Sequence, residues 1–147
     1  SPRERTIVIT RSAADANREK QNLVLLTEPL VRARCGEAPL LLIVDTGAVF
    51  SHVSRTAAAR LGLATRAAGQ RSFSGVGGET KVETELVTHM ALQCDKVLFT
   101  CNGVPAIDRQ PEPPGLPRID GSIGFDLLGS VHVVIDGPAR TLTLREQ

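Results

Sequence analysis

The chain carries an apolar run that leads directly into a carboxylate, Leu41-Leu42-Ile43-Val44-Asp45-Thr46-Gly47-Ala48. Four consecutive large aliphatic side chains indicate a buried β-strand. The strand is followed at once by a carboxylate, a hydroxyl and a glycine. Because Asp, Thr and Gly all favour turns, these residues alone fit an ordinary strand end as well as a catalytic loop.

Short β-prone segments separated by turns lie on both sides of this run. A turn at residues 35–37 joins a predicted strand over residues 23–34 to the one over 40–44. Ser54 is placed to cap a helix that Gly62 ends, and a loop is expected after it. The pattern predicts an all-β, barrel-like domain with one or two short helices. Further strands are expected over residues 6–10, 81–92, 97–104, 131–135 and 141–144, and an irregular proline-rich loop over 109–118.

Composition limits the classes of function. A chain of 147 residues with 41% hydrophobic residues fits one globular domain, which can build its core without disulfides or metals. The net charge is only +1, and there are four Phe but no Trp or Tyr, so nucleic acid is not expected as a partner. No apolar run approaches the ~20 residues of a spanning helix, so no membrane insertion is expected.

The cysteines and histidines do not form a metal pattern. Cys35, Cys94 and Cys101 include no Cys-x-x-Cys pair, and we expect them to be buried or inert, with no metal and no cofactor. The three His residues are scattered along the chain. A serine hydrolase that pairs Ser51 with His52 or His132 is disfavoured, because no Gly-x-Ser-x-Gly motif is present.

Two further motifs follow Asp45-Thr46-Gly47-Ala48 along the chain. The first is the glycine-rich stretch Phe73-Ser74-Gly75-Val76-Gly77-Gly78, and the second is Asp120-Gly121-Ser122-Ile123-Gly124-Phe125-Asp126-Leu127-Leu128. With Ser51 and a short helix leading into Leu61-Gly62-Leu63, they occur in an order and spacing that resembles the retropepsin-like aspartic proteases, in particular their bacterial members. The resemblance covers residues 23–145.

The resemblance implies a closed retropepsin-like barrel over residues 23–147, preceded by an extension over residues 1–22 that includes a possible interface strand. Asp45 is then the catalytic residue, supported by Thr46, Gly47 and Ala48. Thr46 would hydrogen-bond behind the carboxylates, and the Gly47 N–H would approach a carboxylate closely. The glycine-rich stretch would be a flap that covers the substrate, and Ile123-Gly124 would pack under the site. The flap residues are Gly75, Val76, Gly77 and Gly78; an ordinary hairpin loop is the alternative for them.

The number of catalytic motifs bears on assembly. Two neighbouring carboxylates share one proton, so that one activates a water while the other donates to a peptide carbonyl. The chain has a single Asp-Thr-Gly, so the second Asp45 would come from another copy in a two-fold homodimer that hydrolyses polypeptides. Two alternatives remain open: an inactive module that keeps the fold, and one half of a bilobal protease. The predicted strands over residues 6–10 and 141–145 would either join the dimer or pair within one chain.

Several residues depart from the better-known relatives. The flap has no Tyr, Val49 stands where many relatives have a small polar residue, and Phe125 stands where viral relatives carry Arg. Asp126 is expected in the first turn of a helix, where the helix dipole favours a carboxylate. The aliphatic composition favours apolar substrate side chains. Bacterial relatives are often exported or membrane-anchored, which favours an exported location over a cytoplasmic one.

Overall fold

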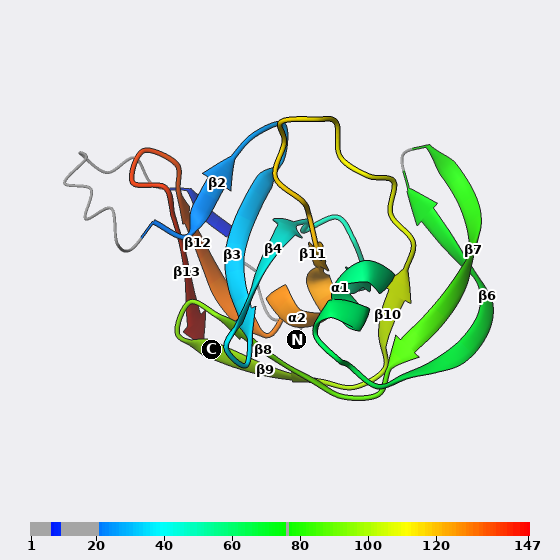
Figure 1. The fold of residues 1–147 in the computed structure, drawn as a ribbon. Helices are drawn as coiled ribbons and strands as arrows, with labels where there is room; N and C mark the ends of the chain where they lie inside the picture. Colours follow the sequence, from blue (N-terminus) through cyan, green and yellow to red (C-terminus); the bar gives the residue numbers. More distant parts are fainter. Residues whose placement is uncertain (1–6, 10–20, 76) are drawn as a thin grey trace.

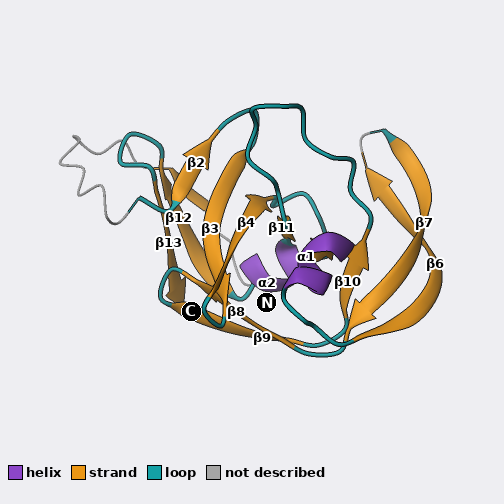
Figure 2. Ribbon diagram, in the orientation of Figure 1, coloured by secondary structure: helices purple, strands orange, loops and turns teal. Residues whose placement is uncertain are grey.

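The computed structural model describes residues 7–9, 21–75 and 77–147, and these form β-strands with two short helices, as predicted (Figures 1 and 2). The helices are α1 (Arg55–Arg60) and α2 (Phe125–Leu128). The strands are β1 (Ile7–Ile9), β2 (Leu23–Leu25), β3 (Pro29–Cys35), β4 (Ala38–Val44), β5 (His52–Ser54), β6 (Thr65–Gly75), β7 (Gly78–Val87), β8 (Met90–Cys94), β9 (Val97–Cys101), β10 (Val104–Ile107), β11 (Gly121–Ile123), β12 (Val131–Asp136) and β13 (Thr141–Glu146).

The strands form one large and one small sheet. The large sheet has ten strands. Nine of them follow the order β6-β7-β10-β5-β11-β4-β3-β8-β9, and the tenth, β2, pairs with β3 beside this path. Figure 1 shows β3 and β4 on one side of the two helices and the β6–β7 hairpin on the other, with β8 and β9 below them. The sheet therefore curves around the helices, and β6 and β9 are the two ends of its hydrogen-bonded order.

Strand β11 lies between β4 and β5, although it comes some seventy residues after them in the chain. It runs parallel to β4, with Ile123 opposite Val44, and antiparallel to β5, with Ser122 opposite His52. The loop that joins β4 to β5 must therefore pass around the end of β11. That loop contains Asp45.

The core is aliphatic, as the composition required. Its largest fully buried side chains include Leu30, Leu42, Leu92, Ile123 and Leu142, and Phe99 is the one aromatic side chain among the buried residues that the structure describes. Ser54 caps α1 by accepting a hydrogen bond from the Ala57 N–H at 3.0 Å, and Gly62 follows the helix with a φ of +63°. The helix predicted from these two residues is confirmed.

The small sheet has the order β1-β12-β13. Strand β1 pairs with β12 in parallel, and β13 pairs with the other edge of β12 in antiparallel fashion. Of the predicted strand over residues 6–10, positions 6 and 10 lie outside the described residues. Both terminal strands thus pair within one chain, which was one of the two arrangements expected for them.

Four expectations about strand boundaries were wrong. The strand expected over residues 23–34 is divided into β2 and β3, which pair with each other in antiparallel fashion. Most of the loop expected after α1 belongs to β6, which begins at Thr65. The strand expected over residues 81–92 is divided into β7 and β8, because the chain turns after Val87 and the Thr88 N–H donates to the Ala64 carbonyl at 2.9 Å. The strand expected over 97–104 is divided into β9 and β10 by a turn at Gly103, whose φ is +69°.

Replacement of Gly121 by Ala tests how closely β11 packs against β5. A Cβ at Gly121 would overlap the His52 carbonyl oxygen and lie 2.8 Å from Val53 Cα, so backbone would have to move. We expect Gly121→Ala to lower the free energy of unfolding by about 3 kcal/mol in denaturant titrations. Gly75→Ala is the control, since nothing lies within 4 Å of its added Cβ. Equal stabilities of the two variants would contradict the packing described.

Candidate active site

Asp45 is the first residue after β4, and its carboxylate is exposed. The Asp45 N–H donates to the Ile123 carbonyl at 3.1 Å, which continues the pairing of β4 with β11. The carboxylate oxygen Oδ1 accepts hydrogen bonds from the Gly47 N–H at 3.0 Å and the Ala48 N–H at 3.1 Å. The turn after the strand therefore fixes one oxygen of the carboxylate. The Thr46 hydroxyl is exposed and takes no hydrogen bond within the described part of the chain.

The loop after Asp45 is attached to the start of α2. The Phe125 N–H donates to the Ala48 carbonyl at 2.8 Å, and the Asp126 N–H donates to the Val49 carbonyl at 3.1 Å. A Cβ at Gly124 would lie 2.8 Å from the Phe50 carbonyl carbon, so the loop and the helix start are in backbone contact. Ile123 is 1% exposed. The structure thus places Ile123 and Gly124 directly beneath the loop.

Ser51 and Asp126 form a second attachment. The Ser51 hydroxyl donates to Asp126 Oδ1 at 2.6 Å and accepts from the Gly124 N–H at 2.9 Å. The Ser51 N–H donates to the same Oδ1 at 2.9 Å. Asp126 lies in the first turn of α2, as predicted, but its carboxylate mainly holds the end of the Asp45 loop. Because these partners occupy the Ser51 hydroxyl, it is not arranged as a hydrolase nucleophile.

His52 and Ser122 form a polar pair near Asp45. The His52 Nδ1 lies 2.8 Å from the Ser122 Oγ, and Ser122 is 4% exposed. Burial and, to a smaller extent, the Arg109 guanidinium lower the pKa of His52, the Asp45 carboxylate opposes them, and the net result is a pKa of about 4. His52 is therefore a neutral imidazole at any pH well above 4. The sequence reasoning treated this histidine as structural.

The glycine-rich hairpin and the loop after Asp45 both contribute residues to one pocket. Gly75 and Gly78 are paired at the tip of the β6–β7 hairpin with Gly77 between them, while Val76 lies outside the described residues. A pocket of about 440 Å³ lies between β6, the β9–β10 turn and the Asp45 loop. Its lining includes the apolar residues Phe50, Phe73, Val104 and Leu127 and the charged residues Arg71 and Asp126.

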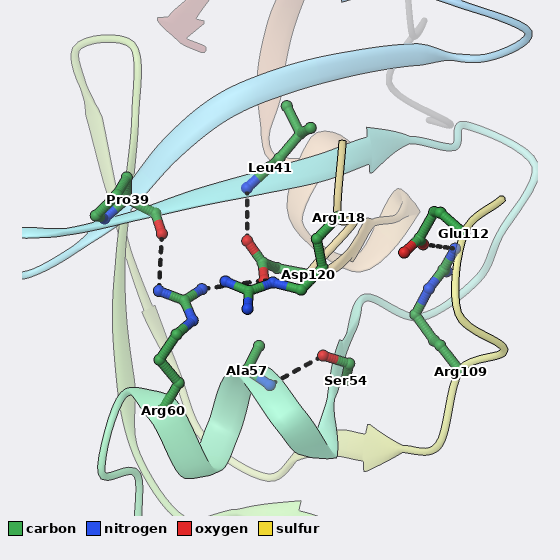
Figure 3. Close-up of polar contacts among 9 residues, drawn as sticks. All are labelled: Pro39, Leu41, Ser54, Ala57, Arg60, Arg109, Glu112, Arg118 and Asp120. Atoms are coloured by element: carbon green, nitrogen blue, oxygen red, sulfur yellow. Dashed lines mark hydrogen bonds and ion pairs between the residues drawn. The ribbon is translucent and has the colours of Figure 1, made fainter. Parts of the chain in front are cut away.

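A buried carboxylate at the other end of β11 organises the surrounding elements. Asp120 is 4% exposed, and its Oδ2 accepts from the Leu41 N–H at 3.0 Å. Its Oδ1 accepts from the guanidinium groups of Arg60 on α1 at 3.0 Å and Arg118 at 3.2 Å (Figure 3). The buried charge is thus paired and hydrogen-bonded, as burial requires. Sequence reasoning quoted Asp120 in a motif but assigned it no role.

The described residues also bear on metal sites, reactive cysteines and membrane-spanning helices. No group of three or more His, Cys, Asp or Glu side chains there is placed to hold a metal ion. All three cysteines are free thiols; burial raises the pKa of Cys94 to about 12 and that of Cys101 to about 11, so neither is reactive near neutral pH. In the same part of the chain, helices are too short to cross a bilayer.

Comparison with known proteins agrees with this geometry. A family model described as aspartyl protease matches residues 31–127. The retroviral protease-like domain of Ddi1 from Leishmania major is similar with a TM-score of 0.52 and 18% identity, over 81% of this chain and 88% of that one. The EIAV protease, solved with the inhibitor HBY-793, has a TM-score of 0.47 and 22% identity, over 72% and 92% of the two chains. None of the curated proteins matches the chain. At 18% identity the likeness to the Ddi1 domain shows the fold alone.

Substitution of Ser51 tests the attachment of the Asp45 loop. Ser51→Ala removes a donor to Asp126 and leaves the Gly124 N–H, which is buried, without its acceptor. We expect a loss of about 2 kcal/mol in the free energy of unfolding, measured in denaturant. Ser74→Ala, at an exposed position in β6, should change it by less than about 0.5 kcal/mol. If Ser51→Ala is as stable as this control, the hydroxyl does not hold the loop.

Proposed function

The chain belongs to the aspartyl protease family and has a retropepsin-like fold, and from this premise we propose that it is an aspartic endopeptidase with Asp45 as its catalytic residue. The supporting observation is the geometry of Asp45. Its carboxylate is exposed at the end of a buried strand, and two backbone N–H groups hold Oδ1. Oδ2 accepts no hydrogen bond from the described residues, so it is free to bind a water.

The proposed reaction uses two carboxylates and one water. Two Asp45 side chains at one site share a proton, because like charges in close contact do not both ionise. The ionised member takes a proton from the water, and the protonated member donates to the carbonyl oxygen of the scissile peptide. The water oxygen bonds to the carbonyl carbon, and the C–N bond then breaks as the amine leaves with a proton. No covalent enzyme intermediate and no metal are needed.

The second carboxylate comes from a second copy of the chain in this proposal. Only one Asp-Thr-Gly is present, and the loop that bears it is exposed. Val49 and Phe50, four and five residues after Asp45, are 65% and 63% exposed, which is unusual for large apolar side chains beside a polar site. An isologous contact across a two-fold axis would cover this loop and bring the two Asp45 side chains together. A bilobal chain with a second motif elsewhere would meet the same requirement.

Substrate binding is assigned to the hairpin and the neighbouring pocket. In our proposal the tip residues Gly75, Val76, Gly77 and Gly78 form a flap that closes over a polypeptide in extended conformation. The pocket of about 440 Å³ would receive an apolar substrate side chain between Phe50 and Phe73. A catalytically inactive binding module with the same fold is the competing function, and it would bind peptides without hydrolysing them.

The catalytic role is tested with Asp45→Asn. The amide keeps the shape of the side chain but cannot act as a base, so hydrolysis of an unstructured protein should fall by about a thousandfold or more at every pH. Wild type should also be blocked by a pepsin-type transition-state inhibitor. Asp136→Asn, at the last residue of β12, is the control and should retain activity. Wild type with no hydrolysis at any pH would favour the binding module.

The assembly is tested by subunit exchange. If each site needs two Asp45 residues, specific activity should fall on dilution below the dimer dissociation constant. Excess Asp45→Asn chain, mixed with wild type, should replace one subunit in most dimers and remove the activity. Activity proportional to wild type alone in this mixture would show that one chain carries a complete site.

A further inference from the structure

Three buried side-chain nitrogens in the described residues have no hydrogen-bond partner: His52 Nε2, Arg55 Nε and Arg109 Nε. They belong to one region. His52 begins β5 and Arg55 follows it directly, while Arg109 follows β10. Strands β5 and β10 run side by side in parallel, with Ile107 opposite Ser54. Folded proteins rarely leave enclosed polar atoms unpaired, since each such atom has lost its hydrogen bonds to water. A group of them in one place points to a partner that arrives from outside the chain.

His52 and Ser122 face away from the hydrophobic core. Val53 and Ile123, their neighbours in β5 and β11, are 2% and 1% exposed and point into it. Because side chains alternate along a strand, His52 and Ser122 project from the opposite face, where they are opposite each other in register. The carbonyl of Ile123, the next residue after Ser122, holds the Asp45 N–H. The polar pair is therefore adjacent to the candidate catalytic residue.

Arg109 adds a positive charge to this pair. Its guanidinium is close enough to lower the pKa of His52, and its contact with Glu112 is a single long ion pair of 3.7 Å (Figure 3). The segment after Arg109 forms no helix or strand until β11 begins. No helix or strand therefore fixes the segment that carries Arg109. If the Ser122 hydroxyl donates to Nδ1, then Nε2 of the neutral imidazole carries hydrogen, and both His52 Nε2 and Arg109 Nε are donors.

We propose that His52, oriented by Ser122 and joined by Arg109, forms a polar subsite beside Asp45 for a substrate side chain that ends in an oxygen acceptor. A carboxamide or a carboxylate has this chemistry, so Gln, Asn, Glu or Asp would be favoured at one position next to the scissile bond. Entry of the side chain moves the Arg109 segment and gives the two enclosed nitrogens an acceptor. The inference rests on the proposed peptidase function. The aliphatic composition led us to expect only apolar substrate side chains. The subsite adds a preference for a polar side chain at one position, because this wall of the site is polar.

Peptide pools in which one position is fixed as Gln, Glu or Leu test the subsite. Wild type should cleave the Gln and Glu pools at least about tenfold faster than the Leu pool when the fixed residue occupies one particular position beside the cleaved bond. His52→Val should bring this ratio close to one. Arg109→Gln should slow cleavage of the Glu pool by about tenfold relative to the Gln pool, because it removes the positive charge.

Two matched variants serve as controls. His132→Val changes an exposed histidine on β12, and Arg34→Gln changes an arginine that is 58% exposed and pairs with Glu37 on the surface. Both should keep the wild-type ratios. A wild type that cleaves all three pools equally, or a His52→Val variant that keeps the preference, would overturn the subsite and leave the peptidase function intact.

A binding measurement separates this inference from the proposed function. If wild type cleaves no pool at any pH, the peptidase proposal fails, and the pools are instead titrated into the Asp45→Asn chain labelled with ¹⁵N-histidine. The His52 Nε2 resonance, identified by its absence from the His52→Val spectrum, should move with the Gln and Glu pools and stay in place with the Leu pool. An Nε2 resonance that responds to none of them would overturn the subsite as well.

Discussion

The candidate site depends on one topological constraint: β11 occupies the space between β4 and β5. Two strands joined by a seven-residue loop would ordinarily pair with each other as a hairpin. Here the third strand separates them, so the loop is stretched around the end of β11. Three backbone groups of the loop find partners at the end of β11 and in the residues after it: the Asp45 N–H donates to the Ile123 carbonyl, and the Ala48 and Val49 carbonyls accept from the Phe125 and Asp126 N–H groups. The position of Asp45 is therefore set by backbone pairing rather than by side-chain packing alone.

Two carboxylates secure β11, one at each end. Asp120 precedes the strand and connects it to β4 and α1 through the Leu41 N–H and Arg60. Asp126 follows it and connects it to the loop through Ser51. The first is buried and neutralised by two arginines, whereas the second is exposed and accepts mainly uncharged donors. One end of this short strand is thus held by a buried, charge-paired carboxylate and the other end by an exposed one.

Sequence reasoning was strong where local chemistry decides the structure and weak where distant segments meet. The capped helix, the proline-rich loop and the strand that leads into Asp45 each follow from a few adjacent residues, and the structure has all of them. The first part of β6 was expected as a loop, because it belongs to an exposed hairpin whose side chains show no alternation of apolar and polar residues. Neither the Ser51–Asp126 contact nor the His52–Ser122 pair could be inferred, because each joins residues that are 75 or 70 positions apart. The signal available in the sequence was a serine next to apolar residues, Ser51 after Val49-Phe50 and Ser122 before Ile123.

The insertion of β11 also has a consequence for how the protein is made. Leu41 and Asp120, which pair across β4 and β11, are separated by 79 positions in the chain. Contacts between segments so far apart form slowly, because the intervening chain must first be brought together. On the ribosome, β4 and β5 emerge long before β11 can be synthesised, and the Asp45 loop has nothing to wrap around until residue 126 has left the exit tunnel. Nascent chains therefore carry Asp45 without an ordered loop, and the candidate site can become ordered only once most of the domain is complete.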